Sequence, residues 1–204
     1  NEINSTSKSL IRIQNFLNAK VSNIEKKITF INTDLKNFNN LLSVFSNLQK
    51  NHMKIDFVIH LAGLKDMNKS LFNPLEYWEN NVKGSINLLK VMEIFNCRNI
   101  VFSSSASIYD ARKDNLFNEK SPIYPLNPYG KTKLAIENIL YDIYKNSSYP
   151  WRIVNLRFFN PAGAHPSGEI GEHPFDKSSN LFPLITKAAI GKTDILNIFG
   201  NDWP

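Results

Sequence analysis

The stretch "DFVIHLAG", residues 56–63, is a nearly continuous apolar run that ends at Gly63. A run without alternating polar residues is typical of a strand that is buried on both faces, as strands of parallel sheets are. Two later stretches, "NIVFSSS" at 99–105 and "WRIVNLRFF" at 151–159, have the same character. We therefore expect these three segments to be strands of one parallel sheet.

Apolar residues at helical spacing lie between and around these strands. Pro74 and the pair Asn127-Pro128 are start signals for two of the helices. The short apolar run "ITFI" at 28–31 is expected to be a further strand. Strands that alternate with helices predict an α/β fold, a doubly wound parallel sheet with helices on both faces. The helices are expected at residues 5–19, 41–48, 74–92 and 127–140, and from Asn180 onward.

The composition indicates a folded globular protein. The chain has 204 residues, of which 42% are hydrophobic and 12% aromatic, enough for a sizeable core. No apolar run reaches the roughly 20 residues that span a bilayer, and the N-terminal residues carry no signal-peptide pattern. Cys97 is the only cysteine, so no internal disulfide can form. We expect a cytoplasmic protein without a membrane partner.

The formal net charge of +6 does not by itself indicate a nucleic-acid partner. The basic residues are scattered among Asn, Asp and Glu and form no run. We expect no nucleic acid, and a modest positive charge is compatible with an anionic small molecule. The first residue is not Met and the chain ends on "FGNDWP", so both ends are expected to be cut from a longer protein.

Ligands of parallel sheets bind beyond the carboxyl ends of the strands, where Ser105 ends one strand. Tyr129 precedes Lys133 by four residues on the next expected helix, so both side chains share a face. Tyr109 and Tyr141 also precede a lysine by four. Tyr109 lies in a loop, however, and Tyr141 lies about 120° around the helix from Tyr129. The pair Tyr129 and Lys133, facing Ser105, is therefore the predicted catalytic site.

A strand ending in serine, followed by Tyr-x-x-x-Lys on the next helix, is similar to the short-chain dehydrogenase/reductase enzymes. Within them, the chain resembles the UDP-glucose 4-epimerases of the extended branch, and the resemblance covers most of the chain from residue 56 onward. The most specific stretches are "NPAGAHPSGEIGE" at 160–172 and "IFGND" at 198–202. The other matching stretches are "VIHLAGLK" (58–65), "PLEYWENNVKGSINLL" (74–89), "FSSSASIY" (102–109), "PYGKTKLAIE" (128–137) and "NLFP" (180–183).

The resemblance implies a Rossmann-type fold and an NAD-dependent epimerisation at carbon 4 of a UDP-hexose. Tyr129 would take the proton from the sugar 4-hydroxyl, directly or through Ser105, while NAD accepts the hydride. A free tyrosine titrates near 10, so a base at neutral pH needs a pKa lower by about three units, or about 4 kcal/mol. Lys133, together with the positive nicotinamide ring, would stabilise the phenolate.

The resemblance also implies which residues bind each ligand, with UDP-glucose and UDP-galactose as partners, no metal, and a homodimer as the complete assembly. The implied catalytic residues are Ser105, Tyr129 and Lys133. The implied cofactor-binding residues are Asp34, Leu61, Ala62, Gly63, Lys65, Asn81, Tyr129, Lys133 and Phe159. The implied substrate-binding residues are Lys65, Ser105, Asn160, Asn180, Leu181, Asn197 and Phe199.

The family pattern is incomplete in this chain. Residues 1–156 would form a NAD-binding domain without its first strand, and residues 157–204 the beginning of the UDP-sugar region. The first glycine is Gly63, so the Gly-rich turn that holds the pyrophosphate is not present. We therefore expect these 204 residues alone to bind NAD only weakly and to be inactive. Lys69 and Asp110 replace the usual Glu and Gly of the family.

Two other interpretations remain open at this point. A sister sugar-nucleotide enzyme, a dehydratase or a decarboxylase, would share the Tyr/Lys pair. Dehydratases of this kind typically carry Thr-Asp-Glu where this chain has the three serines 103–105. The third interpretation is a non-catalytic protein that keeps the fold, against which the intact Ser105, Tyr129 and Lys133 are evidence.

Overall fold

The computed structural model describes residues 6–18, 28–112, 116–171 and 180–197. The chain divides into two compact units, residues 33–159 and residues 1–32 with 160–204. The larger unit contains the sheet and is described first. None of the described helices is long and apolar enough to cross a membrane.

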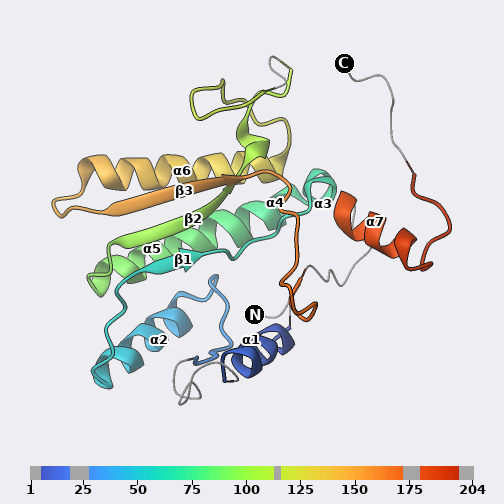
Figure 1. Cartoon of the computed structure of the whole chain (residues 1–204). Helices are drawn as coiled ribbons and strands as arrows, with labels where there is room; N and C mark the ends of the chain where they lie inside the picture. Colours follow the sequence, from blue (N-terminus) through green and yellow to red (C-terminus); the bar gives the residue numbers. More distant parts are fainter. Residues whose placement is uncertain (1–5, 19–27, 113–115, 172–179, 198–204) are drawn as a thin grey trace. The chain divides into compact units, whose positions relative to one another are not determined.

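The described strands form one parallel sheet in the order β1-β2-β3 (Figure 1). They are β1 (Val58–His60), β2 (Asn99–Ser105) and β3 (Arg152–Phe158). β2 lies in the centre and pairs with β3 along its whole length, from Asn99 opposite Arg152 to Ser105 opposite Phe158. The parallel pairing confirms the α/β fold. It also brings the carboxyl ends of β2 and β3 to the same edge.

Two strand predictions need correction. Only three residues of the 56–63 run pair with β2, because the chain leaves the sheet at Leu61 before the turn at Gly63. The run "ITFI" at 28–31 forms no strand, because none of the described residues pairs with it.

The helices predicted to start at Pro74 and after Asn127 do so, and two further helices start at capping residues that were not predicted. The side-chain oxygens of Asn37, Asp66 and Asn127 each accept a hydrogen bond from a backbone N–H in the first turn of the helix that follows. Pro128 then occupies the first turn of the longest helix. The helices are α2 (Phe38–Lys50), α3 (Met67–Phe72), α4 (Pro74–Tyr77), α5 (Gly84–Ile94) and α6 (Pro128–Asn146).

The helix predicted over residues 74–92 is interrupted in a way that its periodicity does not reveal. Between α4 and α5 the chain forms a π-helical segment, η2 (Trp78–Lys83). Such segments are rare and frequently accompany functional sites. Asn81 lies on η2 and is buried. α3 was also not expected, since its six residues are too few to show a period.

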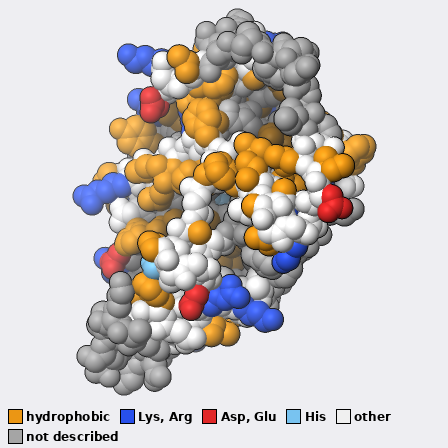
Figure 2. Space-filling view, turned by 45° about the vertical axis from the view of Figure 1, so that its right-hand side comes forward, with side chains coloured by type: hydrophobic (Ala, Val, Ile, Leu, Met, Phe, Trp, Pro, Cys, Tyr) orange, Lys and Arg blue, Asp and Glu red, His pale blue; other side chains and the backbone are white. Residues whose placement is uncertain are grey.

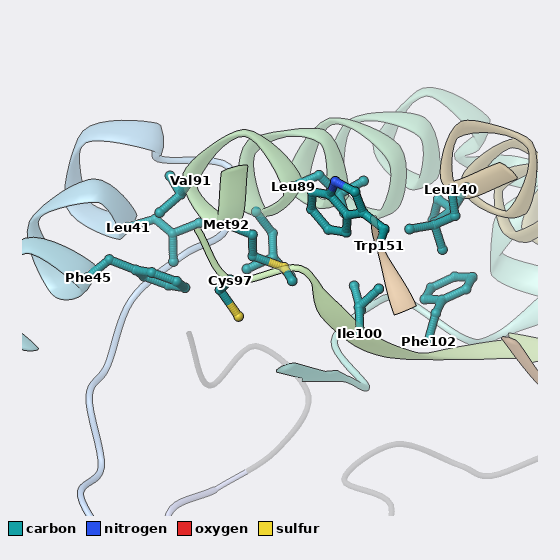
Figure 3. Close-up of a cluster of buried hydrophobic side chains, with 12 residues drawn as sticks. Leu41, Phe45, Leu89, Val91, Met92, Cys97, Ile100, Phe102, Leu140 and Trp151 are labelled. Carbon is teal, nitrogen blue, oxygen red and sulfur yellow. The ribbon is translucent and has the colours of Figure 1, made fainter. Parts of the chain in front are cut away.

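The hydrophobic core lies between β2 and three helices (Figure 3). Leu41 and Phe45 of α2 lie beside Met92 of α5, and Ile100 and Phe102 of β2 lie further along the same cluster. α6 and the start of β3 complete the cluster with Ile136, Leu140 and Trp151. Burial of side chains of this size is the main contribution to the stability of the unit.

In the described part of this unit, helices cover one face of the sheet, where both were predicted to be covered. Ile100, Phe102 and Ser104 of β2 point to the covered face and are buried. The alternate residues of β3 on the other face, Val154 and Leu156, are 50% and 40% exposed.

The second unit contains α1 (Lys8–Asn18) and α7 (Leu181–Ala189), which confirms both predicted helices. Arg12 Nη1 donates a hydrogen bond to the Glu169 carbonyl at 3.2 Å, and the Phe16 ring meets His165 edge-on. These contacts join α1 to the loop that the family resemblance singled out.

Candidate active site

The first two turns of α6 carry Tyr129 and Lys133 to the carboxyl end of β2. The helix starts abruptly because Asn127 Oδ1 accepts from the Gly130 N–H at 2.8 Å and Pro128 fixes the first helical residue. The predicted four-residue spacing is therefore a helical one in the structure.

Gly130 allows the start of α6 to lie directly against the turn that follows β2, η3 (Ala106–Ile108). A Cβ at Gly130 would lie 2.6 Å from the Ser107 carbonyl oxygen and 3.0 Å from Pro125. Only glycine permits this approach, which brings Tyr129 beside Ser105. The sequence contained the signal, a glycine in the first turn of a helix, but its role depends on a contact far along the chain.

The Ser105 hydroxyl lies near the Tyr129 phenol, close enough to affect its pKa. Ser105 Oγ also accepts from the Ser107 N–H at 3.2 Å and lies 3.0 Å from Ser107 Oγ. Burial raises the pKa of Tyr129 above its ordinary value, and the nearby Ser105 hydroxyl lowers it in part. In this state the phenol is protonated at neutral pH.

Lys133 is buried, and burial lowers its pKa to about 8. Its Nζ donates to the Ser103 carbonyl at 2.7 Å and lies 5.8 Å from the centroid of the Tyr129 ring. The ammonium group is therefore directed to the strand, and the stabilisation of the phenolate by Lys133 stays a prediction.

The other two tyrosines are in different surroundings. Tyr141 is 60% exposed on the outer side of α6, as its helical position indicates. Tyr109 is buried, stacks on Phe117 and accepts a hydrogen bond from Arg157 Nη1 at 3.1 Å. Among the residues that the structure describes, neither tyrosine has a serine and a lysine arranged as around Tyr129.

Asn81 joins three elements of the site through its side chain. Its Oδ1 accepts from the Leu64 N–H at 2.8 Å, and its Nδ2 donates to the Leu64 carbonyl and to Thr132 Oγ1. Thr132 Oγ1 in turn donates to the Tyr129 carbonyl at 2.7 Å. Asn81 thus holds the loop after β1 against α6. Gly63 makes this possible, since a Cβ there would lie 3.1 Å from Asn81 Oδ1.

His60 is a buried histidine below this site. Ser85 Oγ donates its proton to the Asn81 carbonyl, so His60 Nε2, 2.8 Å from Ser85 Oγ, is the donor to Ser85. Burial, together with the nearby Lys133 charge, lowers the pKa of His60 to about 4. The ring is therefore neutral at pH 7.

The neutral His60 predicts a loss of stability in acid. Between pH 6.5 and about 4 the unfolded chain binds a proton at His60 that the folded chain does not, so the free energy of unfolding falls as the pH falls. Over this pH range the free energy of unfolding falls by about 3 kcal/mol in total. Denaturant unfolding of the full-length protein at a series of pH values should show this slope, and His60→Gln should flatten it. An equal slope in His60→Gln would contradict the assignment.

The remaining predicted site residues of the larger unit lie at strand ends or turns. Leu61, Ala62 and Lys65 follow β1 and are exposed, and Phe159 follows β3 and is 60% exposed. Asp34 accepts from the Lys36 N–H in the turn before α2. Asp110, one of the family departures, is buried and paired with Arg112.

The predicted substrate residues after Phe159 belong to the second unit. Asn160, Leu181 and Asn197 are exposed, and Asn180 occupies the N-cap position of α7. Phe199 lies outside the described residues.

A buried ion pair beside the catalytic residues was not predicted. Arg157 Nη2 on β3 lies 2.7 Å from Glu137 Oε2 on α6, and Arg157 Nε lies 3.1 Å from Oε1. Glu137 also accepts from Ser104 Oγ at 2.5 Å. The available signal was spacing, because Glu137 follows Lys133 by one further turn of the helix.

Comparison with known proteins places these features in context. A protein-family model described as GDP-mannose 4,6 dehydratase matches residues 2–203. The chain is 43% identical over 178 residues to UDP-glucose 4-epimerase 2 of Oryza sativa subsp. japonica, covering 87% of this chain and 42% of that protein. It is 41% identical over 205 residues to UDP-glucose 4-epimerase 2 of Arabidopsis thaliana, covering 96% of this chain and 57% of that protein.

A solved structure shows the same likeness. The crystal structure of UDP-glucose 4-epimerase from Bifidobacterium longum in complex with NAD+ and UDP matches with a TM-score of 0.85 at 36% identity. The match covers 98% of this chain and 56% of that chain. The resemblance read from the motifs and the Rossmann-type fold are thereby confirmed. This chain spans about half the length of the relatives it matches.

Proposed function

The chain belongs to the GDP-mannose 4,6 dehydratase family, and from this premise we propose that the complete protein is a UDP-glucose 4-epimerase. It would interconvert UDP-glucose and UDP-galactose through a 4-keto sugar. The observation that carries the proposal is the Ser105, Tyr129 and Lys133 arrangement at the carboxyl end of β2. The names of the relatives support the choice of substrate.

The three residues have distinct roles in this chemistry. The Tyr129 phenolate accepts the proton of the sugar 4-hydroxyl, and Ser105, which lies near Tyr129, orients that hydroxyl or passes the proton on. Lys133 provides a cation within 5.8 Å of the Tyr129 ring centroid, and its bond to the Ser103 carbonyl holds it there. Because Tyr129 is a protonated phenol in the structure, its ionisation requires added positive charge at the site.

The residues at the carboxyl ends of the strands fit NAD as the cofactor. A Cβ at Gly63 would lie 3.8 Å from Lys133 Nζ, so glycine keeps the loop after β1 open beside the lysine. When bound, NAD supplies the hydride acceptor and the positive charge that favours the phenolate. We assign its contacts to Leu61–Gly63, Lys65, Asn81, Tyr129, Lys133 and Phe159, with Asp34 toward the adenine.

The substrate contacts and the assembly follow from the same resemblance. We assign the UDP-sugar to Lys65, Ser105, Asn160, Asn180, Leu181, Asn197 and Phe199, with residues 1–156 as the cofactor domain and 157–204 as the start of the substrate region.

A homodimer is supported by exposed apolar side chains, among them Phe72 and Leu75. Figure 2 shows hydrophobic side chains gathered across one face. Cys97, reduced and buried, supports a cytoplasmic enzyme of galactose metabolism.

The direct test is an assay of the full-length protein with UDP-galactose. We expect UDP-glucose to form until the two sugars reach equilibrium, without net consumption of NAD, because the hydride returns to the same carbon. No turnover by protein that contains bound NAD would contradict the proposal.

The matched family model makes a dehydratase the second candidate. Three serines, Ser103–Ser105, stand at the end of β2 where that chemistry typically uses Thr-Asp-Glu, which disfavours it. A 4-keto-6-deoxy product in the same assay would favour the dehydratase and overturn the epimerase.

A further inference from the structure

One face of α6 lies along three consecutive serines of β2, each near a different residue of the helix. Tyr129, Lys133 and Glu137 follow one another at intervals of one helical turn. Lys133 donates to the carbonyl of Ser103, Glu137 accepts from the hydroxyl of Ser104, and Tyr129 lies near the hydroxyl of Ser105. The contacts made by Tyr129 and Lys133 belong to the proposed chemistry, whereas Glu137 has no part in it.

Glu137 is buried, and its carboxylate is fully engaged. Oε1 accepts from Ser104 Oγ at 2.5 Å and from Arg157 Nε at 3.1 Å, and Oε2 accepts from Arg157 Nη2 at 2.7 Å. A buried carboxylate is tolerated when it is paired and hydrogen-bonded in this bidentate way. Arg157 is held in turn, since its Nη1 donates to the Tyr109 hydroxyl at 3.1 Å.

The pairing register explains why this ion pair acts on the strand ends. Ser104 and Arg157 are direct partners in the ladder between β2 and β3. One carboxylate on α6 therefore binds both strands at the same level, one residue before their last pair, Ser105 and Phe158.

We propose that Glu137, held by Arg157, is a positioning residue that fixes the end of β2 so that the Ser105 hydroxyl meets Tyr129. Side chains alternate across a strand, so the bond from Ser104 to Glu137 sets the rotation of the strand end and thereby the direction of the Ser105 side chain. Misplacing a catalytic hydroxyl by about 1 Å can reduce turnover by about 100-fold.

The charges of the pair serve the same purpose. The guanidinium of Arg157 forms an ion pair with Glu137 one turn from Lys133, and the carboxylate raises the pKa of Arg157. The carboxylate of Glu137 is bound to Arg157 and so does not compete for the ammonium group of Lys133, which donates to the Ser103 carbonyl.

This inference rests on the proposed role of Ser105 and Tyr129, and its test uses the full-length protein with two variants and a matched control. Glu137→Gln keeps the shape but removes the charge, and Ser104→Ala removes only the hydroxyl. Asp142→Asn makes the same chemical change as Glu137→Gln at an exposed position of α6. We expect kcat to fall about 30-fold in Glu137→Gln and about 10-fold in Ser104→Ala, with KM within about 3-fold. Asp142→Asn should stay within about 2-fold.

A second readout does not depend on activity. With isotope-labelled tyrosine, the NMR signal of the Tyr129 phenolic carbon, assigned with Tyr129→Phe, reports the position of the Ser105 hydroxyl near the phenol. At fixed pH this signal should move in Glu137→Gln and Ser104→Ala and stay in place in Asp142→Asn. If the wild-type protein does not turn over UDP-galactose, the proposed function fails and the NMR signal alone decides on positioning.

Three results would overturn the proposal. The first is a variant that is less stable but has unchanged kcat and an unchanged Tyr129 signal, which would make the ion pair purely structural. The second is a rise in KM with kcat retained. The third is an equal effect of Asp142→Asn. Should Glu137→Gln fail to fold, Ser104→Ala, which leaves the ion pair with Arg157 in place, decides by the same criteria.

Discussion

Replacement of Tyr129 by Phe in the full-length protein is expected to lower turnover of UDP-galactose by about 100-fold or more. The substitution removes the hydroxyl that takes the proton and leaves the ring in place. Folding should be retained, because the substitution keeps the ring and none of the hydrogen bonds described above is made by the phenolic oxygen. The measurement is kcat, with circular dichroism to verify the fold.

Tyr141→Phe is the matched control for this substitution. Tyr141 lies on the same helix, also precedes a lysine by four residues, and is 60% exposed. Its loss of a hydroxyl should change kcat by less than about 2-fold. Equal damage from Tyr141→Phe and Tyr129→Phe would show that the helical face was assigned incorrectly.

Gly130→Ala is expected to be the most damaging small substitution in the described part of the site. The added Cβ would lie 2.6 Å from the Ser107 carbonyl oxygen, and a backbone atom cannot move aside as a side-chain end can. Either α6 shifts away from η3 or the turn distorts. We expect a loss of about 3 kcal/mol in the free energy of unfolding and a fall in kcat of at least about 10-fold. Denaturant unfolding and the epimerase assay of the full-length protein measure both.

Gly84→Ala provides the control for the loss of a glycine near a helix start. A Cβ at Gly84, the first residue of α5, would meet a side-chain atom, Leu35 Cβ, at 3.2 Å. Alanine also favours the helix by about 1 kcal/mol over glycine. We expect a net change within about 1 kcal/mol. If both variants lost the same stability, the contact with Ser107 would not be the cause.

Much of the larger unit could be predicted because its signals are local. β2 and β3 are apolar runs, and α2 and α6 have both an apolar period and a capping Asn, Asn37 and Asn127. Elements with weak local signals were either not predicted or predicted to be longer than they are. α3 has six residues, and β1 keeps only the three residues that pair with β2.

The sequence by itself determined the spacing of the catalytic residues. Asn127 and Pro128 start α6, and the period of the helix then places Tyr129 and Lys133 on one face wherever the helix lies. These properties depend on neighbours within a few residues, so they can be read along the chain.

Only the tertiary structure decided what that face meets. The ladder between β2 and β3 sets Ser104 opposite Arg157, and Glu137 binds both across distances of 33 and 20 residues. Burial then raises the pKa of Tyr129, while the Ser103 carbonyl accepts a hydrogen bond from the ammonium group of Lys133. Register and burial are set by packing between segments far apart in the chain, and no local pattern encodes which carbonyl or carboxylate will be within 3 Å of a side chain.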